Sequence, residues 1–347
     1  MDGDIVSTTL LLCLDEAVTN HDKEVAEAQQ EVFQLLIDLR SGSSAFSQLL
    51  QRFSLFYRMP SSFSRGRPPK LRYLHQVLGL VLCYYTSSAL NSTICMLFGL
   101  PPSTLAHTLR KAEKALSAAL KGYPPARIAW PSAPEQAELA RLVEAREPLL
   151  KYTFGIIDGK NLRVIQPPNA DLQNAMYNGL LHAVFVTGTI CFAADGCIIW
   201  SRHNCPGSWN DADTSIEFRN KLLSPKYCPD GRTNVVTGSA FPCSAAMTGR
   251  ILTPLKDGDI DRIAPSLCSH HYVAQLAQCT TQTAEWRMGS TQKVYSRLNL
   301  PLPYDPELRG LQISNMFRLV NFRVRTVEIS QIRSTFSGDM EMPLSGE

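Results

Sequence analysis

The sequence predicts an α/β protein in which a mixed sheet flanked by helices follows an α-helical region. Apolar residues up to about position 145 recur at helical spacing, in stretches rich in helix-forming residues. From residue 151 onward, short apolar runs rich in β-branched residues alternate with helical stretches. A chain of 347 residues that is 44% hydrophobic and 19% charged can bury the cores of two domains.

Composition and charge argue against a secreted or membrane-spanning protein and leave nucleic-acid binding open. The net charge of +3 and the pI near 8.3 allow a nucleic-acid partner but do not require one. The acidic N-terminal residues 1–4 do not form a secretory signal, and the apolar run 77–85 is too short to span a bilayer. Ten cysteines without a CxxC pair indicate reduced thiols. We therefore expect a nuclear or cytoplasmic protein that is not secreted and does not bind a membrane.

The first 60 residues are predicted to be helical, above all residues 24–36, as a packed helix or as a coiled coil with a partner. Residues 61–70 form a Pro-, Gly- and Ser-rich linker that carries Arg65, Arg67 and Lys70. This linker is either a solvated hinge or a basic arm that contacts DNA phosphates.

A helix-turn-helix pattern follows the linker. Helices are predicted over residues 74–85 and 90–98, with a turn at 99–102 and a third helix over 104–120 that Ser103 caps. The third helix carries three basic residues that could face a major groove: Arg110, Lys111 and Lys114. An αα-hairpin in an ordinary helical domain gives the same pattern, so DNA binding remains one of two interpretations.

Proline-rich stretches at 123–125 and 130–134 mark the next boundary, and a short helix is expected over 135–145. We expect an N-terminal helical region at 1–60, a helix-turn-helix-like domain at 61–134, a catalytic-type α/β domain at 135–336 and a tail at 337–347.

Strands are predicted in a characteristic order after residue 151. Residues 155–158 should pair with 162–165, and 181–192 should form a hairpin with 197–200 through the turn Ala194-Asp195-Gly196. A helix ending at Leu223 and a strand over 234–237 follow, and then helical stretches near 245–251 and 274–288. A ribonuclease H-like domain has this order of elements.

Acidic residues lie near the ends of these elements. Asp158 ends the first predicted strand, and Glu285 lies in a predicted helix. A pair of Mg²⁺ ions about 4 Å apart, held by such carboxylates, is what phosphodiester chemistry uses. The strand over 234–237 is followed by Gly238, which brings no carboxylate.

The blocks around these residues resemble the DDE superfamily endonucleases of Harbinger-type transposons, in particular a form found in fungi and oomycetes. The resemblance covers roughly residues 70–336 and depends on the order of the blocks. They are Ile157-Asp158-Gly159, residues 177–182, residues 194–199, PGSWND at 206–211, GSAFP at 238–242, AEWRM at 284–288 and residues 318–325.

This resemblance implies that Asp158 and Glu285 bind a divalent cation, Mg²⁺ or Mn²⁺, and that Asp211 is an accessory catalytic acid. The family's middle aspartate falls on Gly238. Thr281 and Arg287 also differ from the residues usual in the family. The resemblance implies a double-stranded DNA substrate, a separate DNA-binding partner protein and a homo-oligomer as further expectations. The alternative is a non-catalytic DNA- or protein-binding relic of a transposase.

Two other acids could compensate for Gly238. Asp211 could line the same cleft as Asp158, or it could cap, together with Asp213, a helix that begins near Thr214. Asp230 belongs to a turn that precedes the strand 234–237, at the wrong end for a ligand.

Overall fold

The computed structural model describes residues 43–59, 70–148, 150–179, 181–238, 241, 247–253 and 291–327. The chain forms two compact units. One consists of Met1–Ala119 with Tyr295–Arg297, and the other of Leu120–Val294 with Leu298–Glu347. In the described part of the chain, no helix is long and apolar enough to cross a bilayer.

The first unit is helical, as predicted. Its helices are α2 (Ser43–Ser54), α3 (Leu74–Thr86), α4 (Asn91–Phe98) and α5 (Pro102–Leu120, whose last residue falls in the second unit). Gly99 ends α4 in the left-handed conformation with a φ of 61°, which only glycine adopts without strain. The α5 helix begins at Pro102, so the prediction that Ser103 caps it was wrong. Proline suits a first helical position because its fixed φ is already helical.

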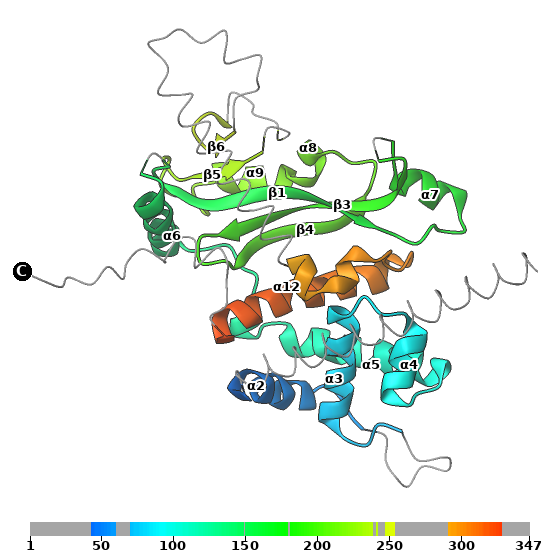
Figure 1. Ribbon diagram of the computed structural model, residues 1–347. Helices are drawn as coiled ribbons and strands as arrows, with labels where there is room; N and C mark the ends of the chain where they lie inside the picture. The colour runs from blue at the N-terminus through cyan, green and yellow to red at the C-terminus, as the bar shows by residue number, and fades with distance from the viewer. Residues whose placement is uncertain are drawn as a thin grey trace, which may run out of the picture. The chain divides into compact units, whose positions relative to one another are not determined.

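The second unit contains a mixed sheet of six strands: β1 (Thr153–Arg163), β2 (Tyr177–Asn178), β3 (Ala183–Ala193), β4 (Ile198–Pro206), β5 (Asn234–Thr237) and β6 (Ile251–Leu252). The order is β2-β3-β1-β5-β6, and β4 also pairs with β3 (Figure 1). The β1–β3 and β3–β4 pairs are antiparallel, whereas β5 and β6 run parallel to β1. This arrangement is consistent with the predicted ribonuclease H-like fold.

The expected pairing of residues 155–158 with 162–165 was wrong, because 155–158 and 162–163 belong to the single strand β1 and residue 164 bridges to Leu302 instead. Antiparallel β3 pairs with β1 continuously from Gly155↔Ala193 to Arg163↔Phe185, and this keeps the intervening backbone extended. The β3–β4 hairpin is confirmed, with Gly196 in its turn at a φ of 87°. Ile251, expected in a helix, instead begins β6, because its backbone pairs with Val235.

Helices cover both faces of the sheet. The long helix α12 (Pro306–Val327) packs on one face, against β4, and α8 (Asp211–Thr214) and α9 (Ile216–Leu223) lie on the other (Figure 1). The helix α6 (Ala133–Arg146) packs against β1, and α7 (Ala170–Met176) against β3. Short 3-10 helices are η1 (Pro124–Ala126) and η4 (Ser296–Asn299).

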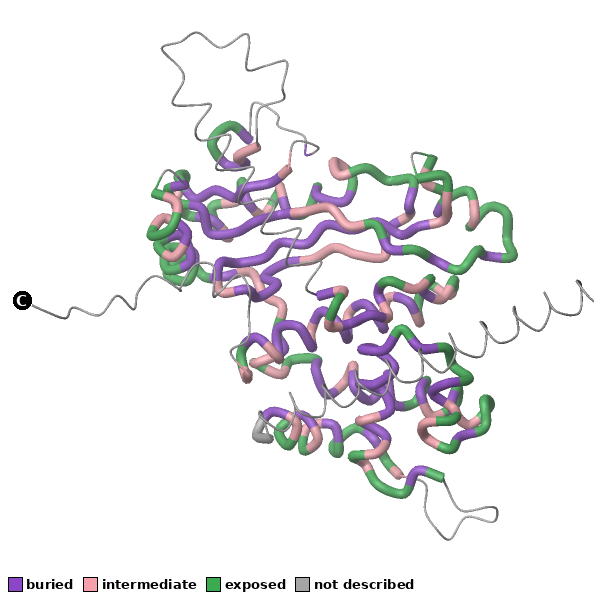
Figure 2. The backbone as a smooth tube through the Cα atoms, viewed as in Figure 1, coloured by how far each residue is buried: buried purple, intermediate pink, exposed green. Residues whose placement is uncertain are grey.

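The core of the second unit lies between the sheet and these helices, where the strands are mostly buried (Figure 2). Fully buried Asn321 of α12 accepts a hydrogen bond from the backbone of Ile198 at 2.7 Å and donates to its carbonyl at 2.8 Å. On the other face, Phe218 of α9 packs its ring against Trp130 and Trp200. The sheet that carries Asp158 is therefore fixed from both sides.

Candidate active site

Asp158 and Gly238 occupy neighbouring positions on adjacent parallel strands. The register pairs Ile156 with Val236 and Ile157 with Thr237, so that the next residues along the two strands are Asp158 and Gly238. Parallel strands lie about 4.8 Å apart, close enough for side chains at these positions to share a metal ion. The geometry of a two-carboxylate edge is present, but only Asp158 brings a carboxylate.

The edge itself is formed differently from the prediction. Asp158 does not end its strand, since β1 continues to Arg163 alongside β3. The neighbouring strand β5 ends at Thr237, so Asp158 lies beside the point where the segment after β5 departs from the sheet. Asp158 is half-buried, and its Oδ1 accepts the N–H of Gly159 at 2.8 Å. The carboxylate is thus held by local backbone at the point where the neighbouring strand stops.

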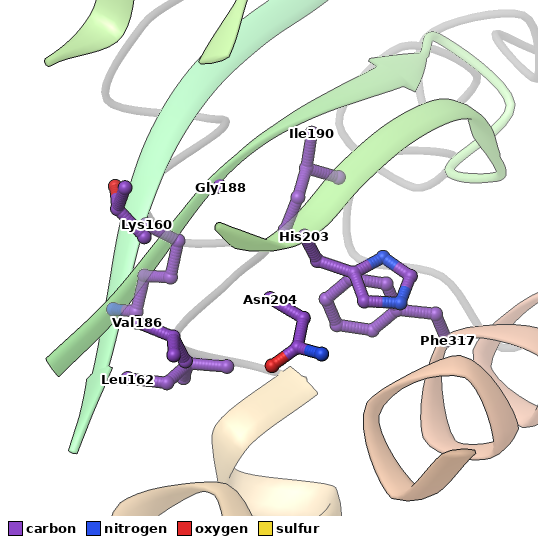
Figure 3. Close-up of a pocket in the computed structure, with 9 residues that line it drawn as sticks. Lys160, Leu162, Val186, Gly188, Ile190, His203, Asn204 and Phe317 are labelled. Carbon is purple, nitrogen blue, oxygen red and sulfur yellow. The ribbon is translucent and has the colours of Figure 1, made fainter. Parts of the chain in front are cut away.

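The side chain of Asp158 belongs to the sheet face that α12 covers. Side chains alternate along a strand, so Asp158 shares its face with Lys160 and Leu162. These two line a cavity together with Ile190, His203 and Phe317 of α12 (Figure 3). The cavity measures about 10 Å³, room for roughly one water molecule. It is too small to receive a nucleotide.

His203 is held on the far side of this cavity from Lys160 (Figure 3). Its ring contacts that of Phe317 edge-on at 5.3 Å, and its Nε2 lies 3.0 Å from the Ser314 hydroxyl. Burial and the positive charge of Arg318 lower the pKa of His203 to about 4. The ring is therefore neutral at neutral pH and acts as a packed, hydrogen-bonded group.

Asp211 reaches β1 from the opposite face. A methyl group added at Gly159 would come within 2.5 Å of Asp211 Oδ1, so the carboxyl group lies directly over the Gly159 backbone. Gly159 faces away from the side to which Asp158 points. The same face carries Thr189, whose hydroxyl is 2.7 Å from that of Thr214 in α8. Burial raises the pKa of Asp211.

The interpretation of Asp211 as a helix cap was wrong. Asn210 is the cap of α8, since its side chain accepts the N–H of Asp213, and Asp211 is the first residue of the helix. Asn210 takes this role because its short amide reaches back to the first turn. The accessory catalytic role of Asp211 stays a prediction, and any such role acts across the strand from the Asp158 side chain.

Three other predicted site residues lie outside the described residues: Glu285, predicted to bind a metal ion, and Arg65 and Arg67, predicted to contact DNA. Asp230 precedes β5, at the end remote from Gly238, and its carboxylate pairs with Arg232 at 2.9 Å. This pairing lowers the pKa of Asp230. No group of three or more His, Cys, Asp or Glu side chains suited to a metal ion occurs within the described ranges.

The predicted DNA-contacting residues of the first unit are exposed. Arg110, Lys111 and Lys114 project from α5, and Lys70 is also exposed. The opposite side of α5 supplies Leu105, Leu109 and Leu116 to the core. The helix therefore has an apolar face turned inward and a basic face turned outward, the arrangement that contact with phosphates requires.

The role of Gly159 was not predicted from the sequence. Asp158 was predicted to end its strand, whereas the strand continues and Gly159 leaves room in it for Asp211. A glycine inside a strand often marks a place where another group approaches the backbone closely, and this pattern could have indicated the contact with Asp211.

Comparison with known families agrees with this geometry. Residues 157–321 match the family model described as DDE superfamily endonuclease. The matched range begins one residue before Asp158 and includes Gly238 and most of α12. No curated protein and no solved structure matches the chain.

Proposed function

We propose that this protein is a DNA endonuclease or transposase by descent, of the Harbinger type, whose catalysis is impaired because Gly238 replaces the second acid. The observation that carries the proposal is the register of β1 and β5, which aligns Gly238 with Asp158 at the strand ends. The match of residues 157–321 to the endonuclease family supports double-stranded DNA as the substrate. The proposed site of action is the nucleus.

In this proposal Asp158 and Glu285 hold Mg²⁺ or Mn²⁺, and Asp211 assists. When bound, such an ion activates a water or a 3′-hydroxyl and stabilises the charge that develops on the phosphate. Among the described residues, Asp158 is the one carboxylate that fits this role at the strand ends. Loss of one ligand of a two-metal site costs several kcal/mol of transition-state stabilisation, roughly 10³-fold or more in rate.

The test is a plasmid-nicking assay in Mn²⁺ with the wild-type protein and Gly238→Asp. We expect cleavage by Gly238→Asp that exceeds wild type by roughly 10³-fold, because the restored carboxylate lies beside Asp158. Adding Asp158→Asn to Gly238→Asp should return the rate to that of wild type. Equal nicking by wild type and Gly238→Asp, with both proteins folded, would overturn the proposed cause of impairment.

A second candidate is a non-catalytic relic that binds DNA or a protein partner. The exposed cations of α5 favour DNA binding independently of the metal edge. If Gly238→Asp gains no activity while the protein still binds duplex DNA, this second function is the correct one. A separate DNA-binding partner and a homo-oligomer belong to both proposals.

A further inference from the structure

A second cavity lies in the α/β unit, at the end of β1 beyond Asp158. It measures about 330 Å³ and is open to solvent. We name it the distal pocket, and the lining residues that matter below are Arg163, Gln166, Gln173, Tyr177, His182 and Val184. A volume of this size lies in the range of ligand pockets, unlike the water-sized cavity beside His203.

Backbone pairing fixes the walls of the distal pocket. Tyr177 of β2 pairs with Val184 of β3, and Arg163 is the last β1 residue paired with β3. The segment after η4 closes the side, because Leu302 donates to the Arg163 carbonyl at 2.9 Å and accepts from the Ile165 N–H at 2.8 Å. The pocket is therefore built on strand backbone and does not depend on side-chain packing alone.

The lining chemistry favours an anion that carries a planar group. Arg163 brings a guanidinium group and His182 an imidazole ring, and no carboxylate belongs to the lining among the residues that the structure describes. Tyr177, a residue that is 43% exposed, contributes an aromatic side chain to the lining. Gln166 and Gln173 add amides that both donate and accept hydrogen bonds. A nucleotide has the matching parts: a phosphate for arginine, a base face for tyrosine and base edges for the amides.

His182 supplies an independent observation. Its φ is 49°, in the left-handed region that a non-glycine residue adopts only at a cost. Strained backbone of this kind persists where surrounding structure enforces it, and it concentrates at ligand sites. The strain turns the chain just before β3 begins at Ala183, so that residues 182–184 border the pocket.

The distal pocket lies along the strand that carries Asp158. Arg163 follows Asp158 by five residues of β1, roughly 16 Å at 3.3 Å per residue. Side chains alternate along a strand, so the side chain of Arg163 points to the face of β1 opposite to that of Asp158.

We propose that the distal pocket binds one unpaired nucleotide of the DNA substrate. Its base stacks on Tyr177 and bonds to Gln166 and Gln173, and its phosphate bonds to Arg163. This inference rests on the proposed function, which supplies the DNA. If the pocket binds an unpaired nucleotide, the protein prefers DNA with an unpaired end to blunt duplex DNA.

The test compares two fluorescent DNAs by anisotropy in EDTA, which prevents cleavage. One is a blunt duplex of about 20 base pairs, and the other adds a single-stranded 3′ overhang of about five nucleotides. We expect wild type to bind the overhang DNA about tenfold more tightly. Tyr177→Ala and Arg163→Gln should each abolish most of this preference and leave affinity for the blunt duplex unchanged.

Matched controls are Tyr304→Ala and Arg232→Gln, an exposed tyrosine and an exposed arginine of the same unit outside the pocket lining. Both should keep the preference for the overhang. Thermal melts establish that all four variants fold. Equal binding of the two DNAs by wild type would overturn the proposal for the distal pocket and leave the proposed function standing. A preference for the overhang that Tyr177→Ala and Arg163→Gln both retain would have the same consequence. Binding of neither DNA would overturn the proposed function together with it.

Discussion

Gly238 brings no side chain to the position that follows β5, while β5 itself is paired in parallel with β1 up to Thr237. The last pair of the parallel register is Ile157 with Thr237, each the residue before Asp158 or Gly238, and Val235 and Val236 of β5 are fully buried. Strand pairing depends on backbone groups and buried apolar side chains, so it does not require an acid at position 238. A metal ion would gain no ligand there, because glycine brings no side-chain oxygen.

A residue-scale prediction concerns Gly159. Replacing it with alanine should lower the free energy of unfolding by about 1–3 kcal/mol, because the new methyl group would lie 2.5 Å from Asp211 Oδ1. Urea denaturation measures the change. Gly231→Ala is the control, since a methyl group there meets no atom within 4 Å, and it should have little effect. Combining Gly159→Ala with Asp211→Ala should recover most of the loss, and a strictly additive double variant would contradict the contact.

A second residue-scale prediction concerns pH. The pKa of His203 is about 4 in the folded protein and near 6.5 in an unfolded chain. Between these values the unfolded chain binds a proton that the folded protein does not, so stability falls as pH drops through 6.5 toward 4. From pH 7.5 to 5 this contribution is about 2 kcal/mol.

Urea unfolding at several pH values measures this dependence. His203→Gln, which cannot titrate, should lack that part of the pH dependence even if it is less stable overall. Arg318 is the charged neighbour that lowers the pKa, so Arg318→Gln should raise the folded-state pKa of His203 and reduce the stability that is lost toward low pH. A pH dependence that is identical in wild type and His203→Gln would contradict the assignment.

At the site, the short apolar runs before Asp158 and Gly238 were sufficient to predict the two strands, but not that β1 continues beyond Asp158. The position of Asp211 could not be predicted in the same way. Its contact with Gly159 depends on which face of β1 the α8 turn crosses, and local sequence patterns do not encode that choice.

At the scale of elements, the length of β1 departs most from the prediction. Gly159, Lys160 and Asn161 favour a turn by local preference, yet they form the middle of a strand. The long strand β3 pairs with all of them, and tertiary pairing overrides weak local preference. The elements α3, α4 and the β3–β4 hairpin were predicted closely, because helical periodicity and the turn residues define them locally.

An element-scale prediction concerns the basic face of α5. Replacing Arg110, Lys111 and Lys114 with glutamine should weaken binding to blunt duplex DNA about tenfold or more near 0.1 M salt. The slope of log affinity against log salt should fall by up to about three, one for each cation that no longer neutralises a phosphate. Fluorescence anisotropy across a salt series measures both quantities.

The control for this helix replaces an equal number of exposed cations in the second unit with glutamine: Lys121, Lys151 and Lys226. The control variant should keep the wild-type affinity and salt slope within about twofold. If both triple variants lose affinity equally, the effect is one of net charge, and α5 is not the contact surface.

At the scale of the whole molecule, the order of elements was the part most accessible to prediction. A helical unit comes before a strand-rich unit, and β1, β3, β4, β5 and α12 follow one another as a ribonuclease H-like domain requires. The distal pocket was not accessible, because it joins β1, β2, β3 and residue 301 through long-range pairing.

The most direct test of the central claim is calorimetric titration of Mn²⁺ into wild type and Gly238→Asp. We predict that Gly238→Asp binds Mn²⁺ at least about tenfold more tightly, about 1.4 kcal/mol, because its carboxylate would stand beside that of Asp158. Asp158→Asn in the Gly238→Asp background should remove this gain. Identical Mn²⁺ affinities for wild type and Gly238→Asp would contradict the claim that the two strand ends form a metal site lacking one ligand.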